Sequence, residues 1–206
     1  MRNAMNNREF PGSLSSNAEH GTEIVLVSQV RRLTDSVVVI SIKSDRKKFS
    51  PGQHIICSSL EEHQAREYSI YSGINDEDLS ILVKAVEGGH FSPKLVNIRA
   101  GDNLRISGPH GHFAIRSPAD ENKKHLFIST GTGIAPFHSM ILSYPSINYK
   151  LVHGVRFGSE AYDAAIYDKD RYILCTSRDS VGHYNGRVNH YLESIDINDW
   201  DYFYLC

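Results

Sequence analysis

Residues 129–136, Ser-Thr-Gly-Thr-Gly-Ile-Ala-Pro, place two glycines between an apolar strand-like run at 125–129 and an apolar helix-like run at 133–144. Pro136 suits the first turn of that helix. A strand that ends in a glycine turn and enters a helix points backbone N–H groups at one spot, and this geometry binds phosphate. The spacing differs from the GxGxxG of the common dinucleotide fold. The segment therefore predicts an α/β unit, and it leaves open whether the turn holds a phosphate or is a tight turn without a ligand.

Strand and helix continue to alternate after this turn. Strand-like runs follow at 149–156, 171–177 and 201–206, and helix-like runs at 159–167 and 186–195. Regular alternation of the two is typical of a parallel, doubly wound sheet.

The first half of the chain has a different pattern, made of short runs rich in β-branched residues and separated by turn signals. Many short strands at regular spacing with one helix are typical of a small antiparallel barrel. Strands are predicted at 23–30, 35–43, 53–60, 66–73, 79–86 and 103–109, and one helix at 92–97.

The change of pattern between Pro118 and Asn122 predicts a domain boundary. We expect an antiparallel β-barrel domain at 23–118 and an α/β domain with a parallel sheet at 119–206. Residues 1–22 are mostly Asn, Ser, Glu and Gly, and they are predicted to be a disordered tail. No apolar run approaches the ~20 residues that cross a bilayer, and no signal-peptide core is visible, so we expect a cytoplasmic protein without a membrane partner.

Charge and cysteine content narrow the classes of function further. The net charge of −2 argues against a nucleic-acid partner. The three cysteines, Cys57, Cys175 and Cys206, are too widely spaced for an iron–sulfur or zinc motif, and no metal site is predicted. Cys57 and Cys175 lie in apolar strand-like runs and are interpreted as small buried hydrophobic residues.

Three arginines follow the predicted strand ends of the second half. Arg156 ends one strand, Arg178 follows Ser177 at the end of the next, and Arg187 begins the helix after it. Because the carboxyl ends of parallel strands share one edge, these side chains are predicted to converge on an anion such as a 2′-phosphate. The alternative is three exposed arginines at loop ends, and their positions favour the anion site.

Two segments of the first half could bind a nucleotide as well. Arg66 and Tyr68 alternate along a strand and share a face, where a cation could meet a pyrophosphate and a ring could stack on a planar group. By itself this run is more typical of an ordinary strand. In the second segment, Gly88 and Gly89 precede Ser92, a predicted helix N-cap, so backbone N–H groups there form either a second anion site or a simple capped helix.

Together these segments resemble the ferredoxin–NADP(H) reductase family, in its bacterial form, over residues 23–206. REYSIYSG is similar to the family's RxYS flavin motif, VEGGHFSPKL to its GxxS/T motif and STGTGIAP to its NADP pyrophosphate loop. HGVR, TSRD and GRV resemble the segments that hold the adenosine phosphate, and YLC resembles the strand that places a cysteine beside the nicotinamide. These motifs in this order are specific, although each alone is not.

The resemblance implies FAD and NADP(H) as cofactors and ferredoxin or flavodoxin as partner. It also implies two catalytic positions, Ser69 near flavin N5 and Cys206 beside nicotinamide C4. FAD is then held by Arg66, Tyr68, Ser69, Gly88, Gly89 and Ser92, and NADP(H) by Thr130, Gly131, Thr132, Gly133, Pro136, Arg156, Ser177, Arg178 and Arg187.

The function expected from this resemblance is hydride transfer between NADPH and bound FAD, followed by one-electron transfer to ferredoxin or flavodoxin. The arginine set favours NADPH over NADH. Family members continue from YLC into a further turn, helix and strand, so the resemblance implies an α/β domain that is C-terminally incomplete at Cys206. Two alternatives stay open: a flavin-binding redox regulator or inactive truncated relative, and an electron-transfer subunit of a larger oxidoreductase.

Overall fold

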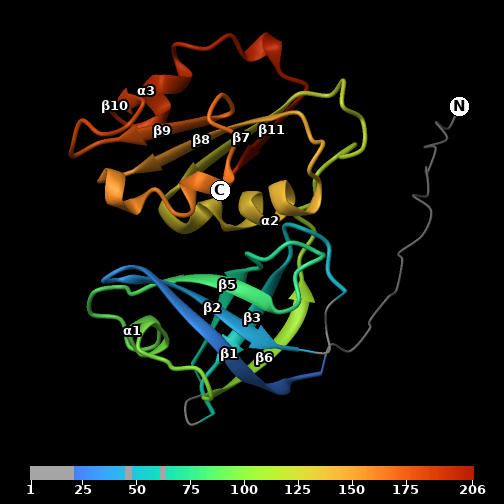
Figure 1. Ribbon diagram of the computed structural model, residues 1–206, viewed down its shortest axis with the longest axis vertical. Coiled ribbons are helices and arrows are strands. Elements are labelled where there is room, and N and C mark those ends of the chain that lie inside the picture. The colour runs from blue at the N-terminus through green and yellow to red at the C-terminus, as the bar shows by residue number, and fades with distance from the viewer. Residues whose placement is uncertain (1–20, 45–47, 61–63) are drawn as a thin grey trace, which may run out of the picture.

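Two β-sheets make up the computed structural model, which describes residues 21–44, 48–60 and 64–206. The sheets lie one above the other along the long axis of the molecule (Figure 1). The first is antiparallel and precedes the second, which is parallel, so the predicted fold class is confirmed. Residues 1–20, nearly all of the predicted tail at 1–22, lie outside the described residues.

The first sheet curls into a barrel. Its strand order is β4-β3-β6-β1-β2-β5, and a bridge between Ile70 and Ile81 joins the end of the first of these strands to the last. One short helix, α1 (Ser92–Val96), follows the fifth strand. The strands are β1 (Glu23–Thr34), β2 (Val37–Lys43), β3 (His54–Ser58), β4 (Ala65–Ser69), β5 (Leu79–Lys84) and β6 (Asn103–His110).

The second sheet has the strand order β10-β9-β8-β7-β11 and a helix on each face. The turn η1 (Gly131–Ile134) leads into α2 (Ala135–Ser143), which lies between the two sheets, and α3 (Val188–Leu192) lies on the far side (Figure 1). The strands are β7 (His125–Thr130), β8 (Tyr149–Val155), β9 (Tyr172–Thr176), β10 (Tyr184–Asn185) and β11 (Tyr202–Leu205).

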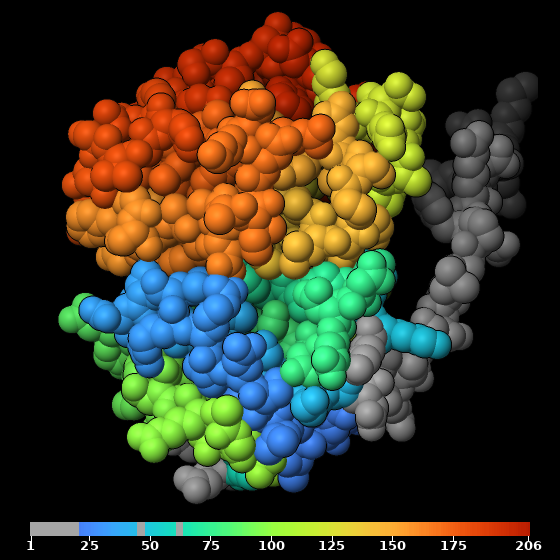
Figure 2. All heavy atoms as spheres, in the orientation of Figure 1, coloured from blue at the N-terminus to red at the C-terminus, as the bar shows by residue number. Residues whose placement is uncertain are grey.

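The continuous apolar run of β2 is explained by burial on both of its faces. Val38 and Ile40 belong to the barrel core, while Val37 and Val39 pack into a second core that includes Phe127 and other residues of the parallel half. Figure 2 shows the two halves in direct contact. Separating the two halves would expose these apolar side chains to water, so the shared core holds the halves together.

One predicted helix, at 159–167, is wrong. The structure has two single 3₁₀ turns there, η2 (Gly158–Glu160) and η3 (Ala164–Ile166), separated by Asp163 with a left-handed φ of 51°. Contacts to the barrel half override local helix propensity in this segment, since both Glu160 and Asp163 bind side chains of that half. The two-residue strand β10 was not predicted, because its sequence carries no apolar run.

No helix among the described residues is long and apolar enough to span a membrane. The interpretation of Cys57 and Cys175 is confirmed, since both are fully buried and lie in separate apolar clusters. Within the described ranges, no group of three or more His, Cys, Asp or Glu side chains is placed to hold a metal ion.

Candidate nucleotide-binding sites

The glycine turn predicted from the sequence is η1, which leaves the carboxyl end of β7 and enters α2. Gly131 has a φ of +52°, and a Cβ built on it would meet no atom within 4 Å, so this side of the turn is open. A Cβ on Gly133 would instead lie 2.6 Å from the carbonyl oxygen of Cys206. Gly131 is therefore required by the backbone conformation and Gly133 by close packing.

The end of β11 is held against this turn by backbone hydrogen bonds. The N–H of Thr130 donates to the carbonyl of Cys206 at 3.1 Å, and the N–H of Cys206 donates to the carbonyl of Ile128 at 3.0 Å. The structure thus places Cys206 beside Gly133 and leaves Cys206 exposed.

A cavity of about 720 Å³ opens between the two halves, and both halves supply its walls. From the barrel it is lined by the exposed end of β4 and by the segment that leads from β5 to α1. From the parallel half it is lined by the glycine turn. The predicted residues on its walls are Arg66, Tyr68, Ser69, Ser92, Thr132, Gly133 and Arg156.

Tyr68 and Ser69 are half-buried at the barrel end of this cavity, beside the exposed Arg66. Burial raises the pKa of Tyr68 to about 12, so its hydroxyl stays neutral at physiological pH. The Arg66 guanidinium donates to the carbonyl of Ala65 at 2.8 Å, and its other N–H donors have no hydrogen-bond acceptor among the described residues. A cation, a neutral aromatic ring and a hydroxyl therefore face one space, and together they suit a flavin nucleotide.

The predicted N-cap at Ser92 is wrong. Phe91 is the N-cap of α1, and the Ser92 hydroxyl accepts a hydrogen bond from the N–H of Val86 at 3.0 Å. This bond closes a turn that contains Gly88, with a φ of +70°, and Gly89. The two glycines shape the turn at the cavity mouth, while Val86 and Ser92 line the cavity itself.

A second cavity, of about 790 Å³, lies along the carboxyl edge of the parallel sheet. Arg178 and Arg187 are exposed on its wall, so their guanidinium groups are free to meet an anion. All three arginines predicted from the sequence line this one cavity. Of the predicted residues, Thr130, Gly131, Thr132, Arg156, Ser177, Arg178 and Arg187 line this cavity.

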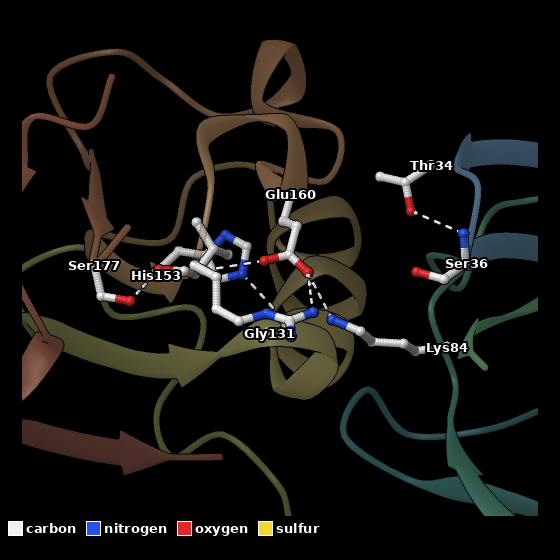
Figure 3. A network of polar contacts seen from close by, with 9 residues as sticks. Thr34, Ser36, Lys84, Gly131, His153, Glu160 and Ser177 are labelled. Carbon is white, nitrogen blue, oxygen red and sulfur yellow. Dashed lines mark hydrogen bonds and ion pairs between the residues drawn. The ribbon is translucent and has the colours of Figure 1, made fainter. Parts of the chain in front are cut away.

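The two cavities meet at an ionic cluster. The Lys84 ammonium lies 2.6 Å from Glu160 Oε1, and the Arg156 guanidinium lies 3.2 Å from the same oxygen (Figure 3). Burial by itself would raise the pKa of Glu160, but the hydrogen bonds from Lys84 and Arg156 outweigh it and lower that pKa to about 2. Lys84, Thr132 and Arg156 line both cavities, so a ligand that occupies both would pass this cluster.

Comparison with protein families assigns the barrel half of the chain to a known family. Residues 25–115 match the family described as "Oxidoreductase FAD-binding domain". The chain thus contains an FAD-binding oxidoreductase domain and is a flavoprotein, and a ferredoxin–NADP reductase is among the proteins it resembles. The matched range ends within the segment between β6 and β7, and it contains Arg66, Tyr68, Ser69 and Ser92.

Relatives and solved structures agree with this assignment. The flavoprotein is 29% identical, over 87% of its length, to the toluate 1,2-dioxygenase electron transfer component of Pseudomonas putida. It is 27% identical, over 65% of its length, to the flavodoxin/ferredoxin–NADP reductase of Buchnera aphidicola subsp. Schizaphis graminum. The chain spans 58% of each of these relatives.

A ferredoxin–NADP+ reductase from Neisseria gonorrhoeae, solved with bound FAD and NADP, has the same fold. It superposes with a TM-score of 0.76 at 19% identity, over 90% of this chain and 85% of that one. The cofactors predicted from the sequence, FAD and NADP(H), are the two nucleotides that these comparisons name. By their names, one of these relatives is an electron transfer component and the other is a flavodoxin/ferredoxin–NADP reductase.

Sequence reasoning missed a second polar cluster between the two halves of the flavoprotein. The Asp163 carboxylate accepts from the Arg31 guanidinium at 2.6 and 2.7 Å and from the Tyr71 hydroxyl at 2.9 Å. The His138 ring stacks on Tyr71 at a centroid distance of 3.6 Å and donates to its backbone carbonyl at 2.7 Å. These residues come from four distant segments, and no local sequence pattern predicts their contact.

Pro136 has a structural role in helix α2 and lines neither cavity. It is buried in the first turn of α2, where its fixed φ suits the helix start, as the sequence predicts.

Sequence reasoning also missed Glu160 and Lys84 as members of the site. They are 76 residues apart, and each is an ordinary charged residue within its own segment.

Proposed function

We propose that this flavoprotein transfers hydride between NADPH and bound FAD, and passes electrons one at a time to ferredoxin or flavodoxin. The observation that carries the proposal is the single cavity whose walls are β4 on one side and the glycine turn on the other. A nicotinamide positioned by the turn and a flavin positioned by β4 would meet in that cavity. Hydride transfer needs this close approach of two rings in a protected space.

The residues present fit a flavin nucleotide, and each has a proposed role. Arg66 and Ser92 hold the pyrophosphate of FAD, Tyr68 stacks on the ring system, and Ser69 donates a hydrogen bond close to the atom that accepts hydride. When bound, FAD supplies the redox chemistry. Gly88 and Gly89 shape the turn that lets backbone approach the phosphate.

The proposed NADP(H) site runs from the glycine turn to the arginines of the second cavity. Thr130 to Gly133 contact the pyrophosphate, with Pro136 fixing the helix that follows, and Cys206 lies beside the nicotinamide. Arg156 is partly engaged by Glu160, so we assign the 2′-phosphate mainly to Ser177, Arg178 and Arg187. Guanidinium groups match a phosphate bidentately, and this favours NADPH over NADH.

We further propose that the domain boundary lies at residues 118–122, within the connection between β6 and β7. This position separates the barrel at 23–118 from the parallel-sheet domain at 119–206. Limited proteolysis that cleaves first within this connection would support the boundary, and first cleavage inside either sheet would contradict it.

One observation favours a second candidate for the electron acceptor. The relative that matches 87% of this chain is named as an electron transfer component of a dioxygenase. We therefore propose two candidate acceptors for the electrons of the flavoprotein: a ferredoxin or flavodoxin, or a component of an oxygenase. Cytochrome c reduction that depends on added ferredoxin supports the first, and turnover only with an oxygenase component supports the second.

The test of the proposal is the visible absorbance of the purified chain, reconstituted with FAD, before and after anaerobic addition of NADPH. Prompt bleaching of the flavin spectrum is the expected result. A bound flavin that persists in its oxidised form would overturn the hydride-transfer proposal and favour a flavin-binding regulator. The same titration with NADH measures the coenzyme preference.

A further inference from the structure

The buried imidazole of His153 joins the core of the parallel sheet to the glycine turn. His153 is on β8 and is fully buried. Its Nε2 lies 2.9 Å from the carbonyl oxygen of Gly131, the first residue of η1 (Figure 3). Its Nδ1 lies 2.9 Å from the hydroxyl of Tyr172, on β9.

These two contacts fix the tautomer of the ring. A carbonyl oxygen can only accept, so Nε2 must carry the hydrogen and donate to Gly131. A neutral imidazole then has Nδ1 as an acceptor, and the Tyr172 hydroxyl donates to it. Burial lowers the pKa of His153 to about 4, so the neutral form with this tautomer is the form present at physiological pH.

The carbonyl of Gly131 is therefore tethered toward the interior of the sheet. In a planar trans peptide the C=O of one residue and the N–H of the next point in opposite directions. The N–H of Thr132 must then point away from His153, to the side where Thr132 lines both cavities. That side is also open at Gly131, where a Cβ would meet no atom within 4 Å.

We propose that His153 is a positioning residue for the dinucleotide, which acts by holding the Gly131–Thr132 peptide with its N–H turned toward the pyrophosphate. Tyr172 is the second member of this relay, because its hydroxyl keeps the imidazole in the donating tautomer. The inference rests on the proposed function, since it assigns a role within the NADP(H) site. A histidine that only fills the core would need neither of these two hydrogen bonds.

The test compares two ligands, NADP+ and adenosine 2′-monophosphate, which has the 2′-phosphate but no pyrophosphate. Isothermal titration with the FAD-reconstituted chain gives both dissociation constants. His153→Phe keeps a planar ring and removes the N–H donor. We expect it to weaken NADP+ roughly 10- to 100-fold, the range for a hydrogen bond to a charged group, and to leave the adenosine 2′-monophosphate constant unchanged.

Two further variants separate the relay from packing. His153→Gln places an amide N–H near the position of Nε2, and it should restore most of the NADP+ affinity. Tyr172→Phe removes only the hydroxyl, and it should weaken NADP+ by a smaller factor in the same direction. These variants also cover the case in which His153→Phe does not fold.

Equal weakening of both ligands, or no change in NADP+ affinity with any of the three variants, would overturn the proposed role of His153. Failure of the wild-type chain to bind NADP+ while it retains FAD is a different result. It would count against the nicotinamide half of the proposed function.

Discussion

At the scale of single residues, the three arginines of the second cavity differ in whether a carboxylate of the protein already pairs with them. Arg156 shares the carboxylate of Glu160 with Lys84, whereas Arg178 and Arg187 are exposed on the wall of the second cavity. This difference was not predictable from the sequence, in which Arg156 and Arg178 occupy equivalent strand ends and Arg187 begins the next helix. It makes Arg178 the sharper probe of coenzyme preference.

Arg178→Gln is expected to raise the KM for NADPH about 10- to 100-fold and to change the KM for NADH by less than about threefold. The reason is the loss of charge-assisted hydrogen bonds to a 2′-phosphate, which NADH lacks. Steady-state kinetics with both coenzymes measure the effect. Arg99→Gln, at an exposed arginine of the barrel, is the matched control and should change neither constant. Equal effects of Arg178→Gln on both coenzymes would refute the assignment.

Gly133 is glycine because of a close contact with Cys206, whereas Gly131 is glycine because of its positive φ. A Cβ on Gly133 would lie 2.6 Å from the oxygen and 2.7 Å from the carbon of the Cys206 carbonyl, so Gly133→Ala must displace the end of β11. We expect Gly133→Ala to lower the rate of flavin reduction by NADPH at least tenfold, while FAD content stays unchanged. Gly131→Ala, in open space but with a φ of +52°, should cost only about 1–2 kcal/mol of stability.

Flavin absorbance after gel filtration measures FAD content for both glycine variants, and stopped-flow absorbance measures the reduction rate. Should Gly133→Ala reduce as fast as the wild-type chain, the close contact with Cys206 would be unimportant for positioning the nicotinamide.

At the scale of elements, the sequence predicts the β7–turn–α2 unit and most strands because their hydrophobic patterns are local. It fails at 159–167, where the alanines favour a helix but the backbone breaks at Asp163. The contacts that break it, to Lys84 and Arg31, come from the other sheet. Tertiary pairing of distant residues carries no signal in a single sequence, and the same reason hides the His153–Gly131 contact.

The pairing of η2 with β5 predicts a pH-dependent contribution to stability. The pKa of Glu160 is about 2 in the folded chain, below its ordinary value of 4.5, so the contribution is fully present above pH 4.5 and is lost as the pH falls toward 2. We expect Glu160→Gln to lower the free energy of unfolding by up to about 3 kcal/mol at pH 7.

Urea denaturation of wild type and Glu160→Gln at several pH values between 7 and 3 tests this prediction. The difference between the two proteins should shrink as the pH falls below 4.5. Glu193→Gln, at an exposed carboxylate just after α3, is the control and should follow the wild-type curve. A difference that stays constant with pH would contradict the ionic origin of the effect.

At the scale of the whole molecule, the two proposed nucleotide sites work together only if the halves keep a fixed relation. An apolar core shared by β2, β5 and α2 supplies one restraint. The Asp163 cluster supplies the directional one, since a bidentate contact with Arg31 and a hydrogen bond from Tyr71 allow little rotation. Burial would raise the pKa of Asp163, but these two partners lower it, so the carboxylate is charged at neutral pH.

Asp163→Asn is therefore expected to affect stability and catalysis together. Asparagine keeps the shape of the side chain but loses the charge that faces Arg31, and the expected loss is about 1–3 kcal/mol in the free energy of unfolding. Because the halves then rotate more freely, flavin reduction by NADPH should slow although neither cavity has lost a lining residue.

Urea denaturation measures the change in stability, and stopped-flow absorbance measures the rate of flavin reduction. Asp168→Asn, at an exposed carboxylate paired with Arg171 in the same segment, should cost less than about 1 kcal/mol and leave the rate unchanged. If Asp163→Asn lowered stability and left the rate of flavin reduction intact, the shared apolar core alone would be enough to align the two sites.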